Sequence, residues 1–139
     1  MILYLDTSAL IKLYVLEDGS DFMRARVLEA EAVFTAVVAY PEARTALAAM
    51  RRGNRLPGAT YRQAKAELDA EWPKLTKIGI TPALSREAGD FAERFELRGF
   101  DAVHLACYAE ASRSGGAAIA FLSFDARLSR AAKLWRASR

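Results

Sequence analysis

Four acidic residues lie where strands are expected to end or helices to begin. Asp6 directly follows an apolar run at residues 2–5, and Asp125 comes two residues after another apolar run at residues 117–123. Glu42 and Asp101 fall in the first turns of two expected helices. Each acid alone has an ordinary explanation, because a carboxylate that caps a helix or faces its amino end contributes about 1 kcal/mol.

Together the four acids predict a metal site. In an open parallel α/β sheet, the carboxyl ends of the strands and the amino ends of the following helices face one edge. Carboxylates gathered within a few ångströms there cannot all ionise without a counter-charge. Oxygen ligands favour hard ions, so we predict that Mg²⁺ or Mn²⁺ binds Asp6, Glu42, Asp101 and Asp125.

Three hydroxyl side chains adjoin these acids. Thr7 and Ser8 follow Asp6, and Ser123 precedes Asp125 by two residues. Each hydroxyl is suited to orient a carboxylate or a metal-bound water. The alternative is that they only cap a helix or finish a strand, and the sequence leaves both interpretations open.

The elements that must position these residues alternate along the chain. Short apolar runs predict strands, and segments with helical periodicity or Gly, Pro and cap residues at their ends predict helices. This alternation indicates an α/β fold, a single domain over residues 1–139 with a mostly parallel central sheet flanked by α-helices. The expected strands are 2–5, 32–35, 77–81 and 117–123; the expected helices are 8–16, 20–28, 42–52, 59–72, 83–97, 99–114 and 126–136.

Composition excludes several classes of protein. With 53% hydrophobic and 27% charged residues, the chain is typical of a folded globular domain. Cys107 is the sole cysteine, which excludes an intramolecular disulfide and favours a reducing, cytoplasmic location. No targeting segment or apolar stretch of about 20 residues is visible, so no membrane association is expected.

Other enzyme classes fit less well. His104 and Cys107 follow Asp101 with a spacing that raises the question of zinc, but a residue six positions along a helix has rotated away from the first. We therefore expect both to be packed core residues. A phosphatase with an Asp nucleophile after the first strand would need a second Asp two residues later, where this chain has Ser8.

Four motifs in order resemble those of the PIN domain family, specifically the VapC-type toxin ribonucleases. They are LDTSALIKLY (5–14), AYPEARTAL (39–47), RGFDAVHLA (98–106) and FLSFDARL (121–128). The resemblance implies a PIN-like fold in which Asp6, Glu42, Asp101 and Asp125 form the metal site. It also implies RNA as substrate, a homodimer, and a cognate VapB-type antitoxin. Ser123 is a mild departure, since family members often carry Thr there.

The residues also limit the reaction. Ribonucleases that use the 2′-hydroxyl as nucleophile commonly need a paired acid and base, usually His, and this chain has one His. A metal-activated water fits better and would leave 5′-phosphate and 3′-hydroxyl ends. We expect Asp6 and Asp101 to bind metal directly, Asp125 directly or through water, and Glu42 to bind metal or orient the attacking water. Loss of one carboxylate should then abolish turnover while barely changing stability.

Basic residues surround the acidic motifs. Without the four acids, 20 basic residues face 13 acidic ones, a balance that favours binding of a polyanion. The alternative to a nuclease is a catalytically silent PIN-like module that binds RNA or protein. The candidate RNA contacts are Arg51, Arg52, Arg55, Arg127 and Arg130.

Overall fold

A four-stranded parallel sheet forms the centre of the computed structural model, which describes residues 1–139. The strand order is β3-β2-β1-β4, with β1 paired to β2 on one side and to β4 on the other. The predicted parallel α/β fold is confirmed. The strands are β1 (Ile2–Leu5), β2 (Ala32–Ala36), β3 (Thr76–Ile78) and β4 (Ile119–Leu122).

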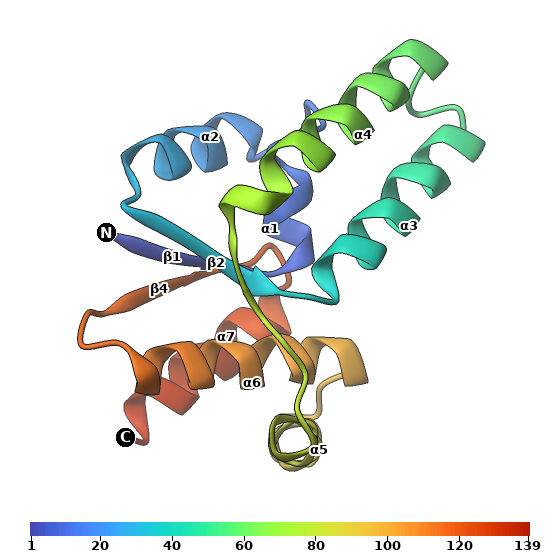
Figure 1. Ribbon diagram of the computed structural model, residues 1–139. Coiled ribbons are helices and arrows are strands. Elements are labelled where there is room, and N and C mark those ends of the chain that lie inside the picture. The colour runs from blue at the N-terminus through green and yellow to red at the C-terminus, as the bar shows by residue number, and fades with distance from the viewer.

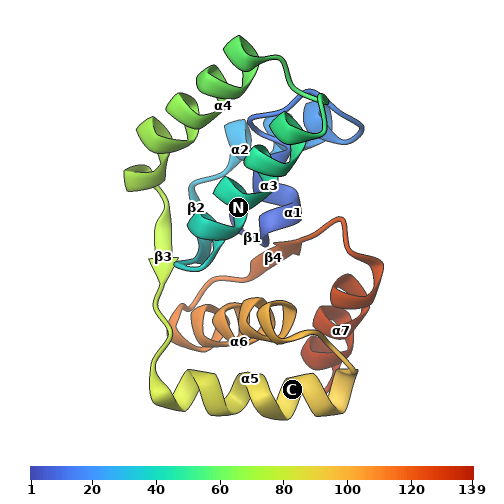
Figure 2. The same ribbon diagram turned by 90° about the vertical axis from the view of Figure 1, so that its right-hand side faces the viewer.

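Helices cover both faces of the sheet. In Figure 2, α5, α6 and α7 lie below the sheet, and α1 to α4 lie above it. The helices are α1 (Thr7–Ile11), α2 (Ser20–Glu29), α3 (Ala39–Arg52), α4 (Gly58–Glu71), α5 (Pro82–Phe95), α6 (Gly99–Ser114) and α7 (Ala126–Ala137), with a 3₁₀ turn at Trp72–Lys74. None of them has the length and hydrophobicity that a transmembrane segment requires.

The first strand joins the two hydrophobic cores. Leu3, Tyr4 and Leu5 are fully buried, and alternate side chains along a strand point to opposite faces. Leu3 and Leu5 pack with α1, α3 and α4, whereas Tyr4 packs with α5, α6 and α7. A strand buried on both faces explains why its sequence is continuously apolar.

The ends of several elements differ from the predicted ones. The first helix stops at Ile11, and residues 12–16 continue as turns instead of a helix through residue 16. Lys12, Leu13 and Tyr14 donate to carbonyls three residues earlier, and the hydroxyl of Ser20 donates to the carbonyl of Val15, which holds the end of this segment. The expected strand 77–81 is reduced to three residues, because β3 is an edge strand that pairs only with β2.

Helices α3 and α4 form a hairpin that projects away from the sheet (Figure 1). Its inner surface is apolar, with Leu47 from α3 and Leu68 from α4 both fully buried. The base of the hairpin lies at the carboxyl end of β2, which places the first turn of α3 at the edge of the sheet. The turn of the hairpin, by contrast, lies far from that edge.

Candidate active site

Asp6 lies at the carboxyl end of β1 and caps the amino end of α1. Its Oδ1 accepts hydrogen bonds from the backbone N–H of Ala9 (2.9 Å) and the hydroxyl of Ser8 (2.7 Å). Its Oδ2 accepts a hydrogen bond from the hydroxyl of Ser123 (2.6 Å). Only 3% of the residue is exposed, and burial raises the pKa of its carboxyl despite these three donors. Asp6 is therefore both a helix cap and a buried acid with a raised pKa.

Ser8 and Ser123 form hydrogen bonds that connect the end of β1 to the segment after β4. Ser8 Oγ accepts from the backbone N–H of Phe124 (2.9 Å), and Ser123 Oγ accepts from the N–H of Asp125 (3.0 Å). The Ser8 and Ser123 hydroxyls are 3.4 Å apart. The loop that carries Asp125 is thus positioned by the same hydroxyls that contact Asp6.

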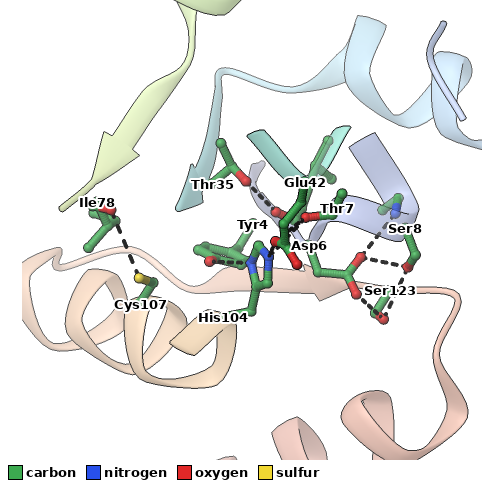
Figure 3. Close-up of polar contacts among 12 residues, drawn as sticks. Tyr4, Asp6, Thr7, Ser8, Thr35, Glu42, Ile78, His104, Cys107 and Ser123 are labelled. Atoms are coloured by element: carbon green, nitrogen blue, oxygen red, sulfur yellow. Dashed lines mark hydrogen bonds and ion pairs between the residues drawn. The ribbon is translucent and has the colours of Figure 1, made fainter. Parts of the chain in front are cut away.

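Glu42 lies in the first turn of α3 and is held by two donors on one oxygen. Its Oε1 accepts from the hydroxyl of Thr7 (2.6 Å) and lies 2.9 Å from His104 Nε2. Burial acts to raise the pKa of Glu42, but the hydrogen bonds from His104 and Thr7 outweigh it and lower the pKa. Thr7, unlike the two serines, therefore contacts Glu42 and not Asp6 (Figure 3).

Asp101 and Asp125 complete the acidic edge. They line one cavity of about 750 Å³ together with Glu42, and Arg98 is the only basic residue in its wall. Asp125 caps α7 through a hydrogen bond from the N–H of Leu128 to its Oδ1 (2.9 Å). Burial, and then the carboxylates of Asp125 and Asp6, raise the pKa of Asp101. Asp101 is therefore coupled electrostatically to Asp6 and Asp125.

The four acids lie at the same edge of the sheet, but their side chains are not close enough together to coordinate an ion as arranged. No group of three or more His, Cys, Asp or Glu side chains is close enough to hold an ion as arranged, so the expected crowding within a few ångströms is only partly present. The chemistry of the donors nevertheless fits a hard divalent cation. The donors are all carboxylate or hydroxyl oxygens, and the carboxylates of Asp125 and Asp6 add to the effect of burial in raising the pKa of Asp101.

The predicted basic residues fall into two places. Arg51, Arg52 and Arg55 lie at the turn of the α3–α4 hairpin, and Arg51 is about 14 Å along the helix axis from Glu42. Arg127 and Arg130 instead lie in the first turns of α7, directly after Asp125. Of the five arginines, only the α7 pair follows one of the acids closely along the chain, and both line a second cavity next to α7.

Three residues at the site were not predicted. Arg98 lines the acidic cavity, with its Nε 4.0 Å from Asp101 Oδ2. Arg94 shares a smaller cavity of about 260 Å³ with Arg127 and Arg130. His104 is buried, as expected of a core residue, but its ring contacts Glu42 and Thr7. In the sequence, His104 lies three residues after Asp101 and so on the same helix face, which could have indicated that it lies near the acids.

Known proteins share this arrangement of elements. Residues 3–134 match the sequence pattern of the PIN domain. The ribonucleases VapC45 and VapC49 of two strains of Mycobacterium tuberculosis are each 35% identical to the chain over 105 residues, 76% of this chain and 73% of theirs.

Solved structures agree on the fold. The crystal structure of M. tuberculosis VapC20, described as a sarcin-ricin loop cleaving toxin, superposes with a TM-score of 0.66 at 18% identity, covering 94% of this chain and 95% of that one. FitAcB from Neisseria gonorrhoeae superposes with a TM-score of 0.65 at 16% identity, covering 96% and 94%. The acid-bearing motifs, the parallel sheet and these similarities together show that the chain belongs to the PIN domain family, as a VapC-type member.

Proposed function

We propose that this protein is a divalent-metal-dependent endoribonuclease, the toxin of a toxin–antitoxin pair. The observation that carries the proposal is the cavity in which Glu42, Asp101 and Asp125 meet at the carboxyl edge of the sheet, with one arginine in its wall. Similarity to proteins named as VapC ribonucleases supports RNA as the substrate.

The proposed reaction is hydrolysis of a phosphodiester. A bound Mg²⁺ or Mn²⁺ would supply an acidified water and neutralise charge on the phosphate. Asp6, Asp101 and Asp125 would hold the ion, and Glu42 would orient the attacking water and accept its proton. The water oxygen would bond to phosphorus while the bond from phosphorus to the 3′-oxygen breaks, and the leaving 3′-oxygen would take a proton from solvent. The products are a 5′-phosphate and a 3′-hydroxyl.

The cavity wall also supports binding of the substrate chain. Arg98 is 89% exposed beside Asp101, and Phe100, with 58% of its surface exposed, follows it in the same wall. A guanidinium pairs with phosphate, and an aromatic ring stacks on an unpaired base. These neighbours favour a single-stranded segment of RNA at the scissile bond.

Partners and location complete the proposal. Membership among the VapC-type proteins supports a VapB-type antitoxin and a homodimer, and an RNA substrate supports a cytoplasmic location. An apolar groove of about 530 Å³ on α3, bounded by Val38, Pro41, Ala46 and Phe100, opens beside Glu42. An apolar antitoxin segment seated there would block the cavity. Light scattering of the protein alone and with a co-expressed antitoxin tests both assemblies.

The decisive experiment incubates the purified protein with end-labelled single-stranded RNA. We expect cleavage with Mn²⁺, its loss with EDTA, and ends that carry 5′-phosphate. An Asp101→Asn protein purified in parallel controls for contaminating nucleases. A 2′,3′-cyclic phosphate as the main product would refute the mechanism. Binding of RNA without cleavage in any divalent metal would favour the catalytically silent module.

A further inference from the structure

His104 is the one histidine of the chain, and it lies buried between the core and the acidic edge. Its ring belongs to α6, one turn after Asp101. Nδ1 lies 3.0 Å from the hydroxyl of Tyr4 in β1, and Nε2 lies 2.9 Å from Glu42 Oε1 in α3. One imidazole thus connects three elements that are distant in sequence (Figure 3).

The partners of the ring decide where its proton lies. A carboxylate oxygen only accepts hydrogen bonds, so the short contact to Glu42 requires a proton on Nε2. The proton of Tyr4 stays on its hydroxyl, because burial in the core raises the pKa of Tyr4 well above its ordinary value. A ring with its proton on Nε2 can accept the hydrogen bond of the Tyr4 hydroxyl at Nδ1 while it donates to Glu42, so this arrangement satisfies both contacts.

The two oxygens of Glu42 consequently differ. Oε1 receives the Nε2–H of His104 and the hydroxyl of Thr7, whereas Oε2 makes no hydrogen bond within the protein. The side chain of Glu42 is 26% exposed and lines the cavity shared with Asp101 and Asp125. Two donors on one oxygen fix the plane of the carboxylate and leave the other oxygen free for the cavity.

We propose that His104 is a positioning residue: with its proton on Nε2 set by Tyr4, it orients Glu42 so that Oε2 serves the metal or its water. The inference rests on the proposed function, because it assigns a role within that site. Groups that orient a ligand in this way typically contribute about 10- to 100-fold to metal affinity or activity.

The first test reads the ring directly. Because the chain has a single histidine, its two ring nitrogens give the only imidazole signals in a long-range ¹H–¹⁵N NMR spectrum. We expect a protonated Nε2 and an unprotonated Nδ1 in the metal-free protein at neutral pH. An unprotonated Nε2 would overturn the proposal.

The second test separates positioning from folding by calorimetric titration with Mn²⁺. We expect His104→Leu to weaken Mn²⁺ binding at least about tenfold. His104→Gln should restore most of the affinity, because the Gln amide reaches the place of Nε2. Tyr4→Phe should give an intermediate loss together with a shift of the ring proton toward Nδ1.

Tyr108→Phe is the matched control for Tyr4→Phe. Tyr108 is also buried, but its hydroxyl donates to the carbonyl of Ile119 (3.0 Å), away from Glu42. We expect it to lower stability without changing Mn²⁺ affinity. If wild type binds Mn²⁺ and folded His104→Leu binds equally well, the inference is wrong and the proposed function stands. If wild type binds no Mn²⁺ and cuts no RNA, the proposed function itself fails.

Discussion

The two halves of the candidate site are held in different ways. The inner acids, Asp6 and Glu42, accept several hydrogen bonds from side chains and backbone groups of the fold. The outer acids, Asp101 and Asp125, line the cavity and have few contacts. Asp125 accepts one cap hydrogen bond, and Asp101 has one arginine, Arg98, at 4.0 Å. The inner acids are therefore held in place by hydrogen bonds within the fold. The outer acids have few such bonds and need a positive charge to offset their mutual repulsion.

Asp101→Asn breaks the outer half and should give the largest effect. We expect a loss of turnover of about 10³-fold or more, because a ligand to a catalytic cation contributes several kcal/mol to the transition state. The fold should persist, since Asp101 has only the 4.0 Å contact to Arg98. Single-turnover cleavage of labelled RNA with saturating Mn²⁺ measures the loss. Activity within tenfold of wild type would exclude Asp101 as a ligand.

The same variant should show how burial and the neighbouring carboxylates of Asp101 make stability depend on pH. Because the pKa of Asp101 is raised in the folded state, the folded protein holds its proton more tightly and loses stability as the pH rises through that pKa. Metal-free Asp101→Asn should therefore melt above wild type at pH 7. The difference should vanish below the ordinary Asp pKa of 3.8.

Asp6→Ala breaks the inner half and should cost stability as well as activity. Removal of the carboxylate leaves Ser8, Ala9 and Ser123 without their acceptor, and we expect a loss of about 1–3 kcal/mol in the free energy of unfolding. This replaces the expectation from sequence that loss of any one acid would barely change stability. Urea unfolding measures it, with Asp6→Asn as the milder control. Unchanged stability would show that these hydrogen bonds contribute nothing.

Substitution of Ser123 tests whether the hydrogen bonds that connect Asp6 to the Asp125 loop contribute to turnover. Its hydroxyl donates to Asp6 and accepts from the backbone N–H of Asp125. Ser123→Ala should lower turnover about tenfold, as loss of a ligand-orienting group does, with a smaller effect on stability. Ser123→Thr keeps the hydroxyl and should retain near wild-type turnover. Equal turnover in all three proteins would show that the hydroxyl has no role.

Substitution of the arginines should give the smallest effect, a change in the salt dependence of RNA binding. Arg130→Ala removes a charge from the helix that follows Asp125, whereas Arg52→Ala removes one at the hairpin turn. In an Asp101→Asn background, only Arg130→Ala should reduce the salt dependence of RNA binding, by about 0.7 in the log–log slope per lost phosphate contact. Fluorescence anisotropy over a salt series measures both slopes. An equal change in both would assign RNA contact to the hairpin too.

The sequence predicted the sheet and the placement of the acids because both follow from local rules. Apolar runs bounded by acids or turn residues locate strand ends, and parallel topology brings those ends to one edge. The short first helix was not predictable from its periodicity. Tyr14 and Val15 are buried as a helix pattern would require, but a turn held by Ser20 buries them equally well.

The contacts of His104 could not be predicted because they are entirely tertiary. A histidine on the buried face of a helix gives the same sequence pattern whether it meets leucine or a carboxylate. Only the meeting of β1, α3 and α6 supplies Tyr4 and Glu42 as partners. Likewise Arg94 and Arg127 line one cavity because Arg127 donates to the carbonyl of Glu96, the residue after α5, a contact that no spacing along the chain reveals.

The position of β4 in the sheet has a consequence for biosynthesis. The strand nearest the amino end of the chain, β1, has its final neighbour in β4, more than a hundred residues later. Ser123 and Asp125 emerge from the ribosome after that strand, so a growing chain lacks a complete set of acids through most of its translation. Under the proposed function, a chain that is still being translated therefore has no complete nuclease site.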